Sequence, residues 1–167
     1  MGEDLFTDFY NQTFRSLWAF VFRVTRDCAL ADEIAQESFV RLLQKGTKGR
    51  EFTNQRSYVF TIASNLMREH WHRSKRFEEL PIKEREGSFV STDEDVDRRI
   101  DFAESYKKLS DIQRALLWLA YVERYDHSEI AVMLNLKKNS VRVLLYRARE
   151  KMQTLLMQSG LKEEVRV

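Results

Sequence analysis

Two sets of cationic and hydrogen-bonding side chains recur at helical spacing, and both are of types that bind nucleic acid. One set occupies a single face of the segment from 55 to 75: Thr61, Ser64, Asn65, Arg68, His72 and Lys75. The other set, Lys138, Arg142 and Arg149, is spaced by four and then seven residues. Cations neutralise phosphates, whereas amides, hydroxyls and guanidinium groups hydrogen-bond to base edges. Both segments are therefore candidate contacts to nucleic acid.

The charge of the chain is divided into blocks, although its formal net charge is only +2. Residues 44–76 hold eight basic and two acidic side chains, and residues 126–158 hold six basic and three acidic ones. Between these blocks, residues 77–101 hold nine acidic and four basic side chains. The basic blocks suggest contact with phosphates. On charge alone, solvated helix faces explain them equally well.

Apolar residues recur at steps of three and four in the N-terminal part, which predicts three amphipathic helices at 5–24, 29–44 and 55–75. The residues expected to face inward in the second helix are Ile34, Ala35, Phe39, Leu42 and Leu43. Those expected on one inward stripe of the third are Val59, Ile62, Ala63, Leu66 and His70. The cations that end the third helix would also complement its dipole, so they do not by themselves require a ligand.

The C-terminal part has the pattern of a helix-turn-helix. After a helix predicted at 109–121, Asp126 and Glu129 form a capping-box pattern that would open a second helix at residue 127. Asn135 falls where the turn needs a left-handed residue. The last helix would bury one seam, made of Val141, Leu145, Ala148, Met152 and Leu155. Its basic stripe lies apart from this seam, as reading of the major groove requires.

Composition limits the other classes of function. The one cysteine, Cys28, cannot form an internal disulfide, so a cytoplasmic location is expected. We expect no signal peptide and no membrane insertion, because the most apolar stretch, residues 17–24, is far shorter than the ~20 residues of a membrane span. Cys28 and the three histidines lack the spacing of a zinc set, and no motif supports a nucleophile–base pair. We therefore expect no metal, no cofactor and no enzymatic activity.

The expected architecture is all-α, with two small helical domains joined by a flexible acidic linker. The first domain would span residues 1–76 and the second residues 100–160. The linker, residues 77–99, contains the single proline and little apolar periodicity. Residues 161–167 would form a tail.

In their order and separation, these blocks resemble the extracytoplasmic-function (ECF) sigma factors, the smallest members of the bacterial sigma-70 family. The resemblance covers residues 5–156 and rests on ALADEIAQESFVRLL, QRSYVFTIASNLMREHWHRSKR and a C-terminal block that ends in VLLYRARE. It implies a region 2 bundle followed by a region 4 helix-turn-helix. It also implies a factor that binds core RNA polymerase and directs promoter-specific initiation, without hydrolysing nucleotide.

The resemblance assigns two sets of residues to region 2. In the family, the second helix docks on the coiled coil of the polymerase β′ subunit, and the matching positions are Asp32, Glu33, Gln36, Glu37 and Arg41. The third helix and the loop before it recognise and open the −10 element, which requires bases to be held out of the stack. The residues implied there, next to Lys45, are Lys48, Arg50, Asn54, Arg56, Thr61, Asn65, Arg68, His72, Arg73, Lys75 and Arg76.

Region 4 is implied to read the −35 element and to touch the flap of the β subunit. The residues expected at this DNA are Lys138, Asn139, Ser140, Arg142, Leu145, Tyr146, Arg147 and Arg149. The resemblance also implies an anti-sigma factor as a partner, in some cases membrane-bound. Where family members usually carry glycines this chain has Asn135 and Asn139, and Leu144 replaces a usual arginine, so the promoter sequence does not follow from the resemblance.

A stand-alone helix-turn-helix regulator, which binds operators without polymerase, is the alternative interpretation. It would explain residues 109–156 but would leave the first domain without a role. Capture of the β and β′ subunits would separate the two interpretations.

Overall fold

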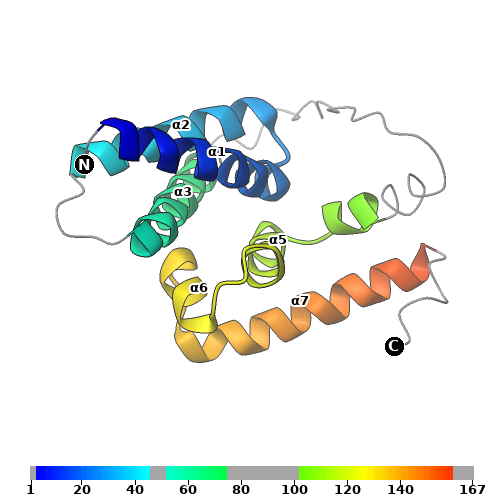
Figure 1. The fold of residues 1–167 in the computed structure, drawn as a ribbon. Helices are drawn as coiled ribbons and strands as arrows, with labels where there is room; N and C mark the ends of the chain where they lie inside the picture. Colours follow the sequence, from blue (N-terminus) through cyan, green and yellow to red (C-terminus); the bar gives the residue numbers. More distant parts are fainter. Residues whose placement is uncertain (1–2, 46–51, 75–101, 160–167) are drawn as a thin grey trace.

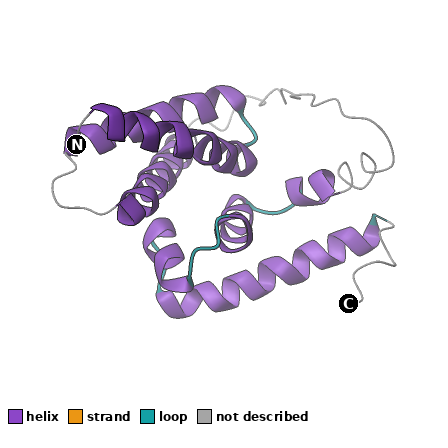
Figure 2. Ribbon diagram, in the orientation of Figure 1, coloured by secondary structure: helices purple, strands orange, loops and turns teal. Residues whose placement is uncertain are grey.

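The computed structural model describes residues 3–45, 52–74 and 102–159. An N-terminal bundle is formed by α1 (Glu3–Thr25), α2 (Cys28–Lys45) and α3 (Phe52–Ser74). The C-terminal unit contains α5 (Asp111–Leu117), the π-helix η1 (Trp118–Val122), α6 (His127–Leu134) and α7 (Lys138–Gln158). In Figure 1 the bundle lies above the C-terminal helices, and within the described ranges there is no strand (Figure 2). The expected all-α fold is confirmed.

The chain turns between α1 and α2 within two residues. Arg26 has a left-handed backbone, with φ of 60°, and its N–H donates to the carbonyl of Phe22 at 2.6 Å. Asp27 then caps α2, because its Oδ1 accepts the backbone N–H of Leu30 at 3.0 Å. This tight connection aligns the two helices side by side, so that Phe39 of α2 packs edge-on against Tyr10 of α1 at 4.8 Å between ring centroids.

Helix boundaries follow the predicted ones closely in α1 and α2, and α6 begins at His127 as predicted, whereas α3 and α5 differ from the prediction. α3 begins at Phe52 rather than at residue 55, so Asn54 belongs to its first turn. The helix expected at 109–121 begins only at Asp111, after a Ser110–Gln113 capping box, and continues from Trp118 as a π-helix. A π-helix adds one residue to a turn, a change that the spacing of apolar residues does not announce.

Two residues expected in the core are exposed. His70 lies a turn beyond Met67, the last buried residue of α3, although it is on the expected side of that helix. Leu43 falls beside the buried stripe of α2, which includes Phe39 and Leu42, and half of its surface is accessible. Spacing identified the apolar face of each helix but did not fix how far the neighbouring helices cover it.

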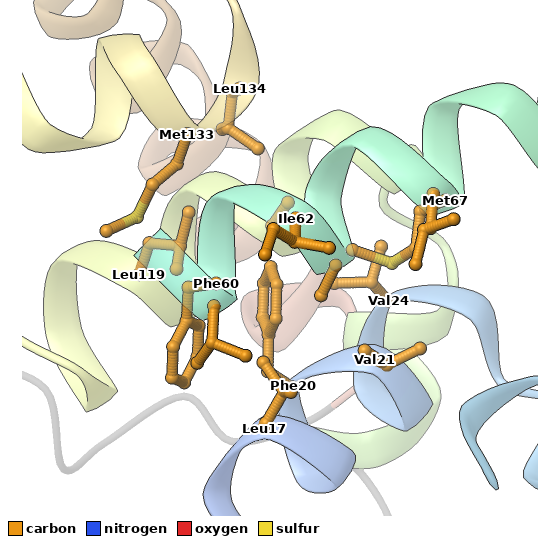
Figure 3. Close-up of a cluster of buried hydrophobic side chains, with 14 of the residues drawn as sticks. Leu17, Phe20, Val21, Val24, Phe60, Ile62, Met67, Leu119, Met133 and Leu134 are labelled. Carbon is orange, nitrogen blue, oxygen red and sulfur yellow. The ribbon is translucent and has the colours of Figure 1, made fainter. Parts of the chain in front are cut away.

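The two units share one continuous core. Figure 3 shows Phe20 of α1 and Phe60 of α3 close to Leu119 of η1, with Met133 of α6 nearby. All four side chains are almost fully buried, and the Phe20 and Phe60 ring centroids lie 5.4 Å apart. α3 packs on α6, and α1 packs on α5. The sequence pattern predicted two helical units but did not predict that they would pack together.

A buried arginine also joins the two units. Arg114 of α5 is only 6% exposed, and its Nε and Nη2 donate to the carbonyl of Val24 at 3.0 and 2.8 Å. Val24 lies in the last turn of α1, where carbonyls have no partner within the helix. Arg114 further donates to the carbonyls of Lys107 and Leu109 and pairs with Asp111. Burial lowers the pKa of Arg114, while the neighbouring Asp111 carboxylate opposes that shift.

Removing this guanidinium should destabilise the packing of the N-terminal bundle on the C-terminal unit. We expect Arg114→Ala to lower the free energy of unfolding by about 2–4 kcal/mol, because several buried carbonyls lose charge-assisted donors. Arg114→Lys, which keeps the charge but not the planar fork, should lie in between. Urea unfolding followed by circular dichroism measures the difference. Arg147→Ala, at an exposed position, is the control, and an equal loss in the two variants would contradict the prediction.

Candidate nucleic-acid and partner interfaces

The helix-turn-helix is built as the sequence indicates. Asp126 Oδ1 accepts the backbone N–H of Glu129, and Glu129 Oε2 accepts that of Asp126, each at 2.9 Å. α6 ends at Asn135, whose φ of 53° and ψ of 48° are left-handed. Leu136 then donates its N–H to the carbonyl of Ala131 at 2.9 Å, which closes the turn. The predicted capping box and left-handed turn residue are both confirmed.

α7 separates a buried seam from an accessible cationic face. Val141, Leu145, Ala148 and Met152 are buried, as expected, and Leu155 is half-buried. Ser140 is half-buried, and the following residues of the expected −35 set are exposed: Lys138, Asn139, Arg142, Tyr146, Arg147 and Arg149. The resemblance also implies Leu145 as a DNA contact, but the side chain of Leu145 is only 6% exposed and packs into the core. We therefore remove Leu145 from the expected DNA contacts.

Some of the exposed side chains of α7 are already held in place. Arg149 Nη1 donates to the hydroxyl of Tyr121 at 3.0 Å. The hydroxyl of Tyr146 donates to Glu150 Oε1 at 2.8 Å, and this hydrogen bond raises the pKa of Tyr146. Arg142 makes no hydrogen bond or ion pair to the described part of the chain. Its guanidinium therefore needs no intramolecular bond to break before it meets a ligand.

Most of the expected −10 residues in the described part of α3 lie on its accessible side. Asn65, His72 and Arg73 are exposed, and Arg68 is half-buried. Asn65 Oδ1 accepts from Arg68 Nη1 at 3.2 Å. Thr61 is half-buried, and its hydroxyl donates to the carbonyl of Ser57 at 2.9 Å.

Part of this set cannot be placed. Lys48, Arg50, Lys75 and Arg76 lie outside the described residues, and for Asn54 only the backbone is described. The expectation for these five residues rests on the sequence alone.

Arg56 differs from the rest of this set because its guanidinium is engaged with the other unit. Its Nη2 lies 2.6 Å from Glu123 Oε2 and 3.1 Å from Ser16 Oγ. Its guanidinium carbon also lies 5.3 Å from the ring centroid of Phe60. The side chain of Arg56 remains 35% exposed, whereas that of Glu123 is 6% exposed. Sequence reasoning missed Glu123, because nothing in spacing alone links two residues 67 positions apart.

α2 presents the expected acidic and amide face. Asp32, Glu33 and Gln36 are exposed, while the half-buried Glu37 pairs with Arg41 at 2.8 Å. Arg41 also reaches Glu69 of α3 at 4.0 Å.

Trp18 of α1 fixes one carboxylate of this face. Its indole Nε1 donates to Asp32 Oδ1 at 2.7 Å, and its ring stacks on Phe22 at 5.2 Å between centroids. No sequence motif signalled this pair, which joins positions 14 residues apart. The carboxylate of Asp32 is thereby oriented before any partner arrives.

Within the described part of the chain, no group of three or more potential metal ligands comes together. None of the helices in those segments is long and apolar enough to cross a membrane.

Family comparison identifies both units. The model of Sigma-70 region 2 matches residues 9–77, and the model of Sigma-70 region 4 matches residues 102–152. The chain belongs to the sigma-70 family. It is similar to the RNA polymerase sigma factor YlaC of Bacillus subtilis, with 24% identity over 98% of both chains. It is also similar to the ECF RNA polymerase sigma factor SigL of Mycobacterium tuberculosis, with 26% identity over 90% of this chain and 88% of that one.

Solved structures share the fold. The sigma factor RpoE in complex with the anti-sigma factor NepR from Bartonella quintana matches with a TM-score of 0.67 and 18% identity, over 91% of this chain and 96% of that one. CnrH in complex with the cytosolic domain of CnrY matches with a TM-score of 0.63 and 22% identity, over 94% of this chain and 90% of that one. These likenesses cover both units of the sigma-70 chain described here.

Asn135, the left-handed residue between α6 and α7, should be important for stability. A residue that has a Cβ but lacks a side-chain amide should fit this backbone conformation less well. Asn135→Ala should lower the free energy of unfolding by about 1–2 kcal/mol, because alanine is strained in that conformation. Asn135→Gly should match or exceed the wild type. Thermal unfolding of the full chain compares the three proteins. Equal stability of the alanine and glycine variants would show that the turn does not depend on the backbone of residue 135.

Proposed function

We propose that this chain is an ECF-type sigma factor that binds core RNA polymerase and directs promoter-specific transcription initiation. The observation that carries the proposal is the pairing of a region 2 match with a region 4 match, in that order, across most of the chain. The alternative, a stand-alone helix-turn-helix regulator, would leave the match over residues 9–77 unexplained. The proposed units are residues 1–76 and 100–160, with a linker at 77–99 and a tail at 161–167.

In this proposal α7 reads the −35 element. An accessible cationic face opposite a buried seam can enter the major groove while the seam holds the helix on the unit. Arg142 is suited to a bidentate bond with guanine, since its guanidinium has no other partner in the described segments. The other proposed contacts are Lys138, Asn139, Ser140, Tyr146, Arg147 and Arg149.

The N-terminal bundle would open the −10 element and dock on polymerase. Exposed amides and cations on α3 are suited to a strand whose bases have left the stack. The proposed −10 contacts are Lys48, Arg50, Asn54, Arg56, Thr61, Asn65, Arg68, His72, Arg73, Lys75 and Arg76. On α2, the carboxylate oriented by Trp18 would meet basic residues of the β′ coiled coil without further ordering. Region 4 would touch the β flap.

The remaining partners and the location follow from the same proposal. The chain would act in the cytoplasm as an initiation factor rather than as an enzyme, with no cofactor of its own. One structural neighbour named above is a complex of the sigma factor RpoE with the anti-sigma factor NepR, which supports an anti-sigma factor as a partner of this chain. That partner could itself be membrane-bound.

Run-off transcription tests the proposed function directly. Purified chain added to core RNA polymerase on genomic fragments should yield transcripts that begin at a small set of sites and are absent with core polymerase alone. The β and β′ subunits should be captured with the tagged chain. Operator binding without capture of polymerase would favour the stand-alone regulator and contradict the proposal.

Arg142→Ala tests the reading role of α7. Binding of the polymerase complex to a promoter found by run-off should weaken by ~1–3 kcal/mol, and discrimination at one −35 base pair should be lost. Lys151→Ala is the matched control, because residue 151 is exposed on the opposite side of α7. Promoter variants assayed by mobility shift give both numbers. A uniform loss across all −35 variants would instead identify Arg142 as a phosphate contact.

A further inference from the structure

The ion pair between Arg56 and Glu123 is the contact between the two units that bears most directly on the proposed function. Arg56 lies near the start of α3 in the N-terminal bundle, and Glu123 directly follows η1 in the C-terminal unit. Their side-chain nitrogen and oxygen are 2.6 Å apart, a distance typical of a charge-assisted hydrogen bond. A proposed DNA-binding cation is therefore paired with an anion of its own chain.

Aromatic rings lie beside this ion pair, and they cover its carboxylate side more than the guanidinium, which remains 35% exposed. The Phe60 ring lies against the Arg56 guanidinium, and Tyr125 meets Phe60 edge-on at 5.7 Å between centroids. Burial raises the pKa of Tyr125 to about 12. A guanidinium–carboxylate pair beside apolar rings is attracted more strongly than one in open solvent. The low exposure of Glu123 thus strengthens its attraction for Arg56, while the exposed part of Arg56 weakens that effect.

The backbone that carries Glu123 is unusual on both sides. The π-helix η1 ends at Val122, and Arg124 has a left-handed backbone with φ of 59°. Both features cost free energy and are typical of functional segments. In addition, the buried indole N–H of Trp118 has no acceptor within the described ranges. Glu123 is therefore held on a backbone segment that carries local conformational costs.

We propose that Glu123 is an intramolecular competitor of DNA for Arg56. A carboxylate and a phosphate offer the guanidinium similar pairs of anionic oxygens, so one excludes the other. While the units are packed, Glu123 occupies Arg56 and the −10 strand binds weakly. When they separate, Arg56 becomes available to that strand. The inference rests on the proposed role of Arg56 in binding the −10 strand.

The test measures binding of the full chain, without polymerase, to a fluorescent single-stranded oligonucleotide with the −10 sequence of a promoter found by run-off. Glu123→Gln keeps the shape of the side chain and removes its charge. It should tighten binding by about three- to tenfold, the range expected for losing a partly exposed charge-assisted pair. Fluorescence anisotropy gives the dissociation constants.

Two controls separate competition from a general change in charge. Glu104→Gln makes the same charge change in the same unit, at an exposed carboxylate that pairs with Lys107 at 2.7 Å, and should leave binding unchanged. In an Arg56→Gln background, Glu123→Gln should give no gain, because the cation it frees is absent. A similar gain in that background, or with Glu104→Gln, would overturn the competition.

Separation of the units can be observed independently. Cys28 is exposed and is the one cysteine of the chain, so a spin label there can be paired with another at Gln153→Cys, an exposed position on α7. Electron spin resonance should show a single distance population for the doubly labelled Gln153→Cys protein and added longer distances when Glu123→Gln is also present. Identical distance distributions would mean that Glu123 does not hold the units together and would contradict the inference.

The outcomes also distinguish the inference from the function on which it rests. If Arg56→Gln impairs promoter opening by the polymerase complex but Glu123→Gln does not tighten binding by the free chain, the proposed function stands and the competition is wrong. If Arg56→Gln opens promoters as well as the wild type does, Arg56 is not a −10 contact. The inference then fails even when run-off transcription confirms the sigma activity.

Discussion

The guanidinium of Arg114, buried against the end of α1, is the constraint around which the two halves of this molecule are arranged. It provides donors for a carbonyl of Val24 that the helix itself cannot satisfy, and it does so from α5, which belongs to the other half. Apolar side chains of α1, α3, η1 and α6 fill the space beside it. An unpaired guanidinium at that depth would be costly. The hydrogen bonds of Arg114 therefore fix where α1 lies on α5, in addition to the stabilisation that buried apolar surface provides.

This packing divides the candidate DNA-binding residues into two groups. Arg142 and the neighbouring cations of α7 are exposed while the halves are together. Arg56, by contrast, is held at the junction by Glu123. Under the proposed function, the α7 contacts would be available before Arg56 is, and polymerase could set the order in which they engage DNA.

The local structure of this protein was largely predictable, because it depends on signals that lie close together in sequence. The capping box at Asp126 and Glu129 and the left-handed Asn135 involve residues at most a few positions apart. The buried seam of α7 follows from helical periodicity. By contrast, the pairs Arg114–Val24, Arg56–Glu123 and Trp18–Asp32 depend on how whole helices dock, and no spacing encodes that. The exposure of His70 has the same cause. Periodicity predicts which side of a helix is apolar, but it does not predict how far along the helix the neighbouring helices cover that side.

Glu123 and Arg56 belong to the same chain, and this has a consequence for regulation. An inhibitor supplied as a separate protein loses its hold when it is diluted or outnumbered, whereas an anion on the same chain has a fixed effective concentration near its target. Raising the cellular level of this factor would titrate any separate inhibitor but would leave each molecule's own restraint unchanged. Overproduction of such a protein would thus not activate it. Release of Arg56 from Glu123 would require contact with polymerase or DNA.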